Sequence, residues 1–108
     1  MNVRLTLPAV GDLAEAVAYY DERQPGLGIQ FADEFTRAVE RIVQFPEAWV
    51  IFCPGFRRCL MKRFPYGVLY EIQPDTIVVH GIMCLSQAGE RWLSRLRELR
   101  LPPGKSQT

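Results

Sequence analysis

The chain has 108 residues, of which 48% are hydrophobic and 23% are charged. This length suits one domain, and the composition is that of an ordinary soluble globular protein, which excludes disordered and fibrous classes. No apolar run approaches the roughly 20 residues that cross a bilayer, and the N-terminus lacks the apolar segment of a signal peptide. We therefore expect a cytoplasmic protein without a membrane partner.

Charge is distributed unevenly along the chain, although the formal net charge is only +1. Residues 1–49 contain four basic and eight acidic side chains, a net charge of −4, whereas residues 50–108 contain nine basic and four acidic ones, a net charge of +5. Such asymmetry is compatible with a basic binding surface in the second half, and equally with elements that differ in their solvated residues.

Apolar periodicity predicts a strand and then two helices in the first part of the chain. Residues 2–7 alternate between apolar and polar side chains, as a half-buried strand does, and Pro8 ends the run. Residues 8–23 have helical spacing and a solvated acidic face that includes Asp12; after the breaker Gln24–Gly28, a second helix continues to about Phe45. Helices joined by so short a connection form an antiparallel pair whose shared apolar face needs a cover.

The second half predicts strands and then one more helix. We expect, in order, a connecting stretch with a short edge strand, a hairpin around a Phe-Pro-Tyr-Gly corner, a central strand, and a C-terminal helix with arginines around its polar side. Their ranges are 49–56, 56–72 with the corner at 64–67, 76–83 and 87–101. The run 76–83 is β-branched and apolar on both sides, which is typical of a buried strand.

This order predicts an α+β fold in which an N-terminal helical hairpin packs on one face of a mostly antiparallel sheet, followed by a C-terminal helix. We expect a single domain over residues 1–101 and a loose C-terminal tail over residues 102–108. The core should contain side chains from the first two helices and the later strands, namely Leu13, Val17, Phe31, Phe35, Ile42, Val68, Tyr70, Ile77 and Val79.

The first arm of the hairpin is unusually basic for a strand, because Arg57, Arg58, Lys62 and Arg63 occur there without an acidic residue. Side chains alternate between the two faces of a strand, so Arg58 and Lys62 are predicted on one face and Arg57 and Arg63 on the other. Two interpretations stay open. The long side chains bury their stems and keep their charged ends in water, or they form a basic floor for an acidic partner or a phosphate backbone.

Little else in the sequence indicates chemistry. His80 is the only histidine and lies in the most apolar strand, so we expect a core or strand-face histidine and no metal site. Cys53, Cys59 and Cys84 lack the paired spacing of ligands and are expected to be buried free thiols. We expect no cofactor.

Several short motifs, in order along nearly the whole chain, resemble the RelE/ParE superfamily of bacterial toxins, which includes plasmid stabilisation proteins. They are Asp12-Leu13-x-x-Ala16-x-x-x-Tyr20, Pro25-Gly26-Leu27-Gly28-x-x-Phe31, Ile42-x-x-Phe45-Pro46-Glu47, Arg57-Arg58-x-x-x-Lys62-Arg63-Phe64-Pro65-Tyr66, Tyr70 and Arg91-Trp92. The resemblance implies a small α+β fold and the toxin of a type II toxin–antitoxin pair, which a small antitoxin neutralises.

The resemblance leaves more than one activity open. ParE-like members inhibit DNA gyrase, RelE-like members cleave mRNA on the ribosome, and a degenerate toxin would bind its antitoxin without toxicity. We expect the antitoxin to bind across the sheet and the C-terminal helix, with acidic residues against the basic strand. The residues that the resemblance implies for contact with target or antitoxin are Arg57, Arg58, Lys62, Arg63, Tyr66, Arg91 and Trp92.

One departure from the family pattern favours the ParE-like activity. Many relatives carry a His-x-Arg-Arg-Asp-Pro segment after the last strand, where this chain has Cys84-Leu85-Ser86-Gln87-Ala88-Gly89. RNA cleavage needs a proton acceptor, a proton donor and cations, and residues 102–108 contain no Tyr, His or Glu. We therefore expect a non-enzymatic toxin that acts by binding, with no catalytic residue assigned. In the endonuclease alternative, Tyr66 or Tyr70 would assist proton transfer.

Overall fold

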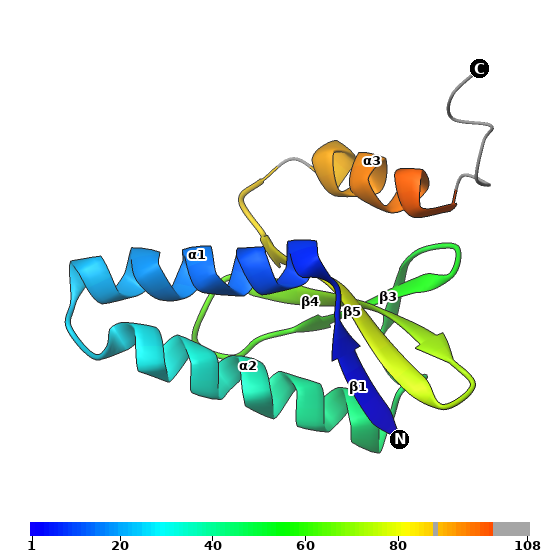
Figure 1. The fold of residues 1–108 in the computed structure, drawn as a ribbon, viewed down its shortest axis with the longest axis horizontal. Helices are drawn as coiled ribbons and strands as arrows, with labels where there is room; N and C mark the ends of the chain where they lie inside the picture. The colour runs from blue at the N-terminus through cyan, green and yellow to red at the C-terminus, as the bar shows by residue number, and fades with distance from the viewer. Residues whose placement is uncertain (88, 101–108) are drawn as a thin grey trace.

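The computed structural model describes residues 1–87 and 89–100 (Figure 1). Its elements follow the predicted order of strand, two helices, strands and helix. They are β1 (Asn2–Leu5), α1 (Leu7–Arg23), α2 (Leu27–Gln44), β2 (Val50–Cys53), β3 (Phe56–Leu60), β4 (Tyr66–Gln73), β5 (Thr76–Cys84) and α3 (Gly89–Arg100). The predicted domain boundary at residue 101 and the tail at 102–108 lie outside the described residues. None of the helices in the described part of the chain has the length and hydropathy to cross a membrane.

The five strands form one mixed sheet in the order β1-β5-β4-β3-β2. β1 runs parallel to β5 and every other neighbouring pair is antiparallel, so the prediction of a mostly antiparallel sheet is confirmed. β5 is an interior strand between β1 and β4, as its apolar run predicts, although the middle position of the sheet belongs to β4. The short edge strand expected before the hairpin is β2.

The connection between β3 and β4 differs from the predicted corner. β3 ends at Leu60 and β4 begins at Tyr66, so the connection is formed by residues 61–65, and Tyr66 and Gly67 are strand residues. Within it Arg63 has a φ of 71°, in the left-handed region. The strand therefore ends before Lys62, so Lys62 and Arg63 lie in the connection and not in the strand that the sequence predicts for them.

The helical hairpin is fixed at its start and at its turn by side-chain caps. Thr6 Oγ1 accepts a hydrogen bond from Ala9 N at 3.3 Å, and a proline occupies the first turn of α1, where its missing N–H is not needed. At the turn, Asp21 Oδ1 accepts from the backbone N–H groups of Gly26 and Gly28 at 2.9 and 3.3 Å. These bonds orient α2 antiparallel to α1.

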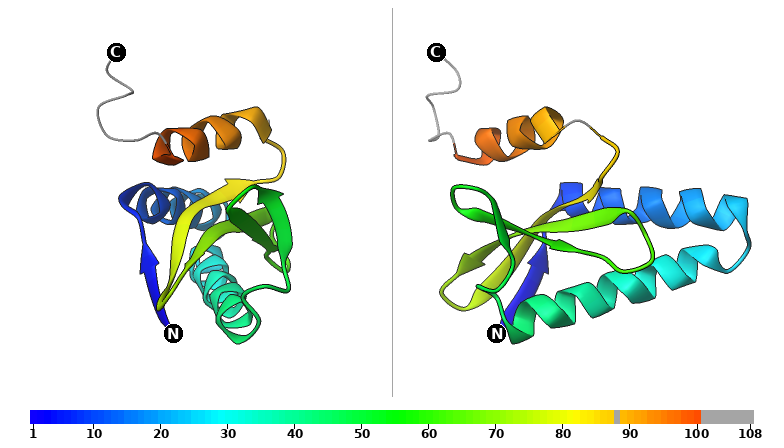
Figure 2. Two further views of the ribbon diagram at one scale, coloured as in Figure 1. Left: turned by 90° about the vertical axis from the view of Figure 1, so that its right-hand side faces the viewer. Right: turned by 180° about the vertical axis from the view of Figure 1, so that it is seen from behind.

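The sheet carries a core on each face. One face is covered by the helical hairpin, and we call it the hairpin face. There α1 and α2 pack against strand residues that include Val68, Tyr70 and Ile77. On the other face, Trp92 and Leu96 of α3 pack with Phe56, Leu69 and Met83. Both views in Figure 2 show α3 and α2 at opposite ends of the molecule, with α1 and the sheet between them.

The predicted core is mostly confirmed. Of the nine side chains expected there, seven are buried, and Leu13 and Val17 are partly buried. In α3, Trp92 and Leu96 face inward as predicted. Leu99, expected on the same side, is 51% exposed, because the apolar contacts of α3 with the sheet end at Leu96.

Candidate functional site

Arg57 is engaged within the protein. It lies opposite Tyr70 in the sheet and so shares the hairpin face. Its Nη1 donates to the carbonyls of Glu47 and Trp49 at 3.1 and 2.7 Å. These hydrogen bonds tie β3 to the segment between α2 and β2, which gives Arg57 a structural role.

Arg63 and Lys62 lie in the connection between β3 and β4 rather than in the strand. Arg63 Nη2 donates to Gln30 Oε1 at 2.5 Å, and its Nη1 is 3.9 Å from Glu34 Oε2. The largely buried Glu34 also pairs with Arg37 at 3.2 Å. Arg63 therefore anchors the connection to α2, whereas Lys62 is exposed.

Arg58 extends its side chain over β4. It points away from the hairpin face, and its stem crosses Gly67, where an added Cβ would lie only 2.9 Å from Arg58 Cγ. Its Nε is buried and has no hydrogen-bond partner among the described residues. Arg58 thus packs its stem on the sheet, as long basic side chains commonly do. The four basic residues of the arm do not form one cluster.

Three of the predicted contact residues do come together, in a cleft of about 480 Å³ between α1 and the start of α3. Tyr66 comes from the first position of β4, and Arg91 and Trp92 come from the first turn of α3. The opposite wall comes from α1 and presents two carboxyl and two phenol side chains: Asp12, Glu15, Tyr19 and Tyr20.

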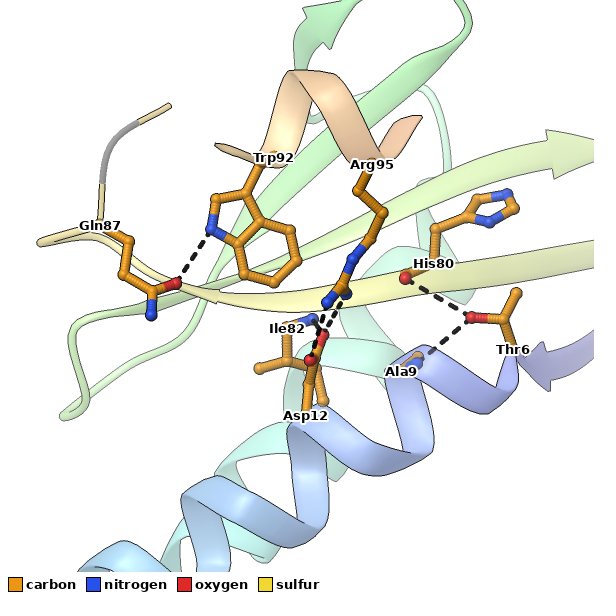
Figure 3. Close-up of polar contacts among 8 residues, drawn as sticks. All are labelled: Thr6, Ala9, Asp12, His80, Ile82, Gln87, Trp92 and Arg95. Carbon is orange, nitrogen blue, oxygen red and sulfur yellow. Dashed lines mark hydrogen bonds and ion pairs between the residues drawn. The ribbon is translucent and has the colours of Figure 1, made fainter. Parts of the chain in front are cut away.

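The cleft exists because α3 approaches β5 closely at Gly81. Trp92 and Arg95 point from α3 toward this part of β5 (Figure 3). A Cβ at Gly81 would lie 2.6 Å from Trp92 Cζ3 and 3.0 Å from Arg95 Nη1, so only glycine permits the approach. The guanidinium carbon of Arg95 lies 4.4 Å from the centre of the Trp92 ring, and Trp92 Nε1 donates to Gln87 Oε1 at 3.1 Å.

Asp12 joins α1, β5 and α3 (Figure 3). Its Oδ2 accepts from Arg95 Nη1 at 2.7 Å and from Ile82 N at 2.9 Å, and its Oδ1 accepts from Arg95 Nη2 at 3.3 Å. The prediction that Asp12 belongs to a solvated acidic face is wrong, since its side chain is only 13% exposed. The ion pair takes Asp12 out of solvent because α3 folds back onto α1.

Two phenols of the cleft, Tyr20 and Tyr66, are held in their neutral form by burial. Burial raises the pKa of Tyr66, and the neighbouring Cys84 thiol and Tyr20 phenol add to the rise. Burial also raises the pKa of Tyr20. Near neutral pH both side chains therefore donate or accept hydrogen bonds as phenols, and neither is a general base.

Tyr70, the other phenol of the endonuclease alternative, lies on the hairpin face and does not line the cleft. Its hydroxyl donates to the carbonyl of Pro46, and the residue is fully buried. Burial raises the pKa of Tyr70 to about 12, although nearby Arg57 opposes the rise. Its hydroxyl therefore holds the end of α2 against the sheet.

The histidine and the cysteines are part of the framework. His80 is buried as predicted, with Nε2 2.9 Å from Glu71 Oε1. No cysteine forms a disulfide, and Cys59 is buried as predicted, but Cys53 and Cys84 are only partly buried because they end their strands. Within residues 1–87 and 89–100, no three His, Cys, Asp or Glu side chains are grouped to hold a metal ion.

Sequence reasoning missed the three residues that attach α3: Asp12, Gly81 and Arg95. Asp12 and Arg95 are 83 positions apart, so no local pattern relates them. Gly81 does carry a signal, because an isolated glycine inside an apolar strand often marks a close approach of another segment.

Comparison with known proteins adds a family and a fold. The family model described as "ParE toxin of type II toxin-antitoxin system, parDE" matches residues 3–90. Among solved structures, a chain of the chromosomal ParDE toxin–antitoxin system from P. aeruginosa is similar, with a TM-score of 0.71 and 18% identity, covering 80% of this chain and 97% of that one. No curated protein matches the sequence. At this identity the structural similarity shows a shared fold.

Proposed function

Because the chain belongs to the ParE toxin family of type II toxin–antitoxin systems, we propose that it inhibits growth by binding a macromolecular target, DNA gyrase, and that a cognate antitoxin neutralises it by direct binding. The family match over residues 3–90 carries the proposal. We assign the binding of the antitoxin to the cleft between α1 and α3.

The arrangement of the basic arm supports binding over RNA cleavage. Cleavage through the 2′-hydroxyl needs proton carriers beside the cations that stabilise the charged phosphorane. Arg57 and Arg63 instead bond to groups of the protein itself. The phenol of Tyr70 is bonded to a backbone carbonyl on the hairpin face. Arg57, Arg63 and Tyr70 are thus occupied by structural contacts.

The cleft fits a segment of the antitoxin with an apolar anchor and a carboxylate. Tyr66 and the half-exposed ring of Tyr19 offer aromatic surface, whereas Trp92 is only 3% exposed and supports the cleft from within. Aromatic and arginine side chains often dominate binding energy at protein interfaces. Arg91 is exposed on the α3 side of the cleft and supplies the positive charge for the carboxylate. An antitoxin segment bound in the cleft would contact both α1 and α3.

Arg58 and Lys62 contribute to association in a different way, through long-range attraction of an acidic antitoxin. Reversing both charges, Arg58→Glu with Lys62→Glu, should slow association and reduce its salt dependence. Stopped-flow or surface-based kinetics at several ionic strengths measure both quantities. A second variant, Arg97→Glu with Thr36→Glu and Gln44→Glu, makes the same change in net charge at exposed positions elsewhere. Unchanged kinetics in the first variant would mean that Arg58 and Lys62 are solvated surface only.

The test of the proposed function is induction of the chain in bacteria, followed by measurement of growth, plasmid supercoiling and mRNA integrity. We expect growth to stop, supercoiling to change and primer extension to show no new mRNA ends, and we expect the antitoxin to reverse the first two effects. Codon-phased cuts that vanish in an Arg58→Ala, Lys62→Ala variant would establish the endonuclease alternative instead. Normal growth with intact antitoxin binding would identify a degenerate toxin.

A further inference from the structure

The outer side of α1, opposite the sheet, is apolar for three turns. Its residues are Leu7, Val10, Gly11, Ala14 and Ala18, and all are exposed. Leu7 is 86% exposed and Val10 is 48% exposed. We call these five residues the outer face of α1. The helix is also apolar on its inner side, where Ala9 and Ala16 are buried against the sheet.

The neighbouring helix shows that this exposure is not general to the hairpin. Apart from Ile29 in the first turn, the exposed side of α2 carries polar and charged residues, which is the usual composition of a solvated helix face. They are Asp33, Thr36, Arg37, Glu40 and Gln44. A helix that is apolar on both sides is typically covered on both sides. The outer face of α1 therefore needs a partner.

The shape of the outer face fits another helix. A Cβ added at Gly11 would meet nothing within 4 Å, and the next two residues of the outer face are Ala14 and Ala18. Small side chains allow two helices to pack at the short end of the interaxial range, about 8 Å. Leu7 and Val10 then provide larger apolar side chains at one end of the contact.

The charges at the two ends of α1 identify that helix as α1 of a second copy. Arg4 is exposed just before the N-terminus of α1, and the first turn of α1 contains no acidic residue. Asp21 and Glu22 are exposed in the last turn, and the one basic residue there, Arg23, bends back onto the Tyr19 ring. The helix dipole adds positive charge to the first end and negative charge to the second. Two antiparallel copies place each positive end beside a negative one.

We propose that the outer face of α1 is an isologous interface between two copies of this chain, packed antiparallel. A two-fold axis between Gly11 and Ala14 sets Leu7 against Ala18 of the partner subunit and brings Arg4 to the acidic end of the partner's helix. The residues of α1 that line the cleft, such as Glu15 and Tyr19, lie on another side of the helix. Dimer formation therefore leaves the cleft open.

The test is sedimentation equilibrium of the full chain over a range of concentrations. We expect a dimer that Ala14→Arg dissociates, raising the dissociation constant at least about tenfold, because a charge would enter an apolar contact. Arginine is a good helix former, so α1 persists and the thermal midpoint of the isolated monomer stays unchanged. Thr36→Arg on the exposed side of α2 is the matched control and leaves the dimer intact.

Charge exchange tests the antiparallel arrangement. Arg4→Glu and Glu22→Arg should each weaken the dimer, and the two together should restore it, since the pair then meets with signs exchanged. A monomer at all concentrations, or a dimer insensitive to Ala14→Arg, would overturn the proposal. So would a monomer whose affinity for the antitoxin falls on Ala14→Arg, which would assign the outer face to a helix of the antitoxin.

Discussion

The two faces of the sheet are covered in different ways. On the hairpin face, two long helices bury a continuous core in which Phe31 stacks or makes edge contacts with Tyr20, Phe64 and Tyr66. On the other face, the short helix α3 is attached by Trp92, Leu96 and one ion pair to Asp12. The hairpin face therefore supplies most of the stability. Substitutions in α3 should lower the free energy of unfolding less than substitutions in the core of the hairpin face.

The largest loss of stability is expected from Phe31→Ala on the hairpin face. Phe31 is fully buried, and truncation of a buried phenylalanine typically costs about 3–5 kcal/mol. Ile29→Ala, two positions earlier in the same helix, is the control, because Ile29 is 68% exposed. Urea unfolding measures both. Equal small effects would mean that the aromatic cluster is not the centre of the core.

Gly81→Val tests the attachment of α3. The new side chain would collide with Trp92 and Arg95, and forced overpacking costs about 1–3 kcal/mol. We expect α3 to leave the sheet while α1 and α2 remain folded. Hydrogen exchange should then show loss of protection in α3 alone.

Gly89→Ala is the control for this experiment, since a Cβ at Gly89 meets nothing within 4 Å. Loss of protection in α1 and α2 as well as in α3 would contradict the separation between the two faces. Unchanged protection in α3 would contradict its close approach to Gly81.

The fold was predictable where its determinants are local. The alternation in residues 2–7, the helical spacing on both sides of Gln24–Gly28 and the apolar run of β5 are local patterns, and the structure has a strand, two helices and a strand there. The first strand is shorter and less buried than predicted, because it ends at Leu5 and Leu7 already belongs to α1. The attachment of α3 is a relation between distant residues, and Asp12 and Arg95 look like ordinary solvated charges when each is seen in its own helix. The same holds for Arg57, whose acceptors are backbone carbonyls that no sequence pattern displays.

The smallest effect on stability in the hairpin core should come from Tyr70→Phe, which removes one hydrogen bond and costs about 1 kcal/mol at neutral pH. The pKa of Tyr70 is raised from 10.0 to about 12 in the folded protein. Folding therefore favours the neutral phenol. Its contribution to the free energy of unfolding is complete below pH 10 and is lost as the pH rises toward 12.

Unfolding midpoints between pH 9 and pH 12 should thus fall less steeply in Tyr70→Phe, while part of the slope persists because the pKa of Tyr66 is raised as well. Ile29→Ala, which removes no titratable group, is the control and should leave the slope unchanged. An identical pH profile in wild type and Tyr70→Phe would contradict the buried, bonded state of Tyr70.

The measurement that tests the central claim most directly is the affinity of the antitoxin for Arg91→Glu and Arg97→Glu. Both arginines are exposed on α3, but only Arg91 lines the cleft. Neither substitution should change the free energy of unfolding by more than about 0.5 kcal/mol. We predict that Arg91→Glu weakens antitoxin binding about tenfold or more, as loss and reversal of an interface charge does, and that Arg97→Glu leaves it within about twofold. Equal affinities for the two variants would contradict the assignment of binding to the cleft.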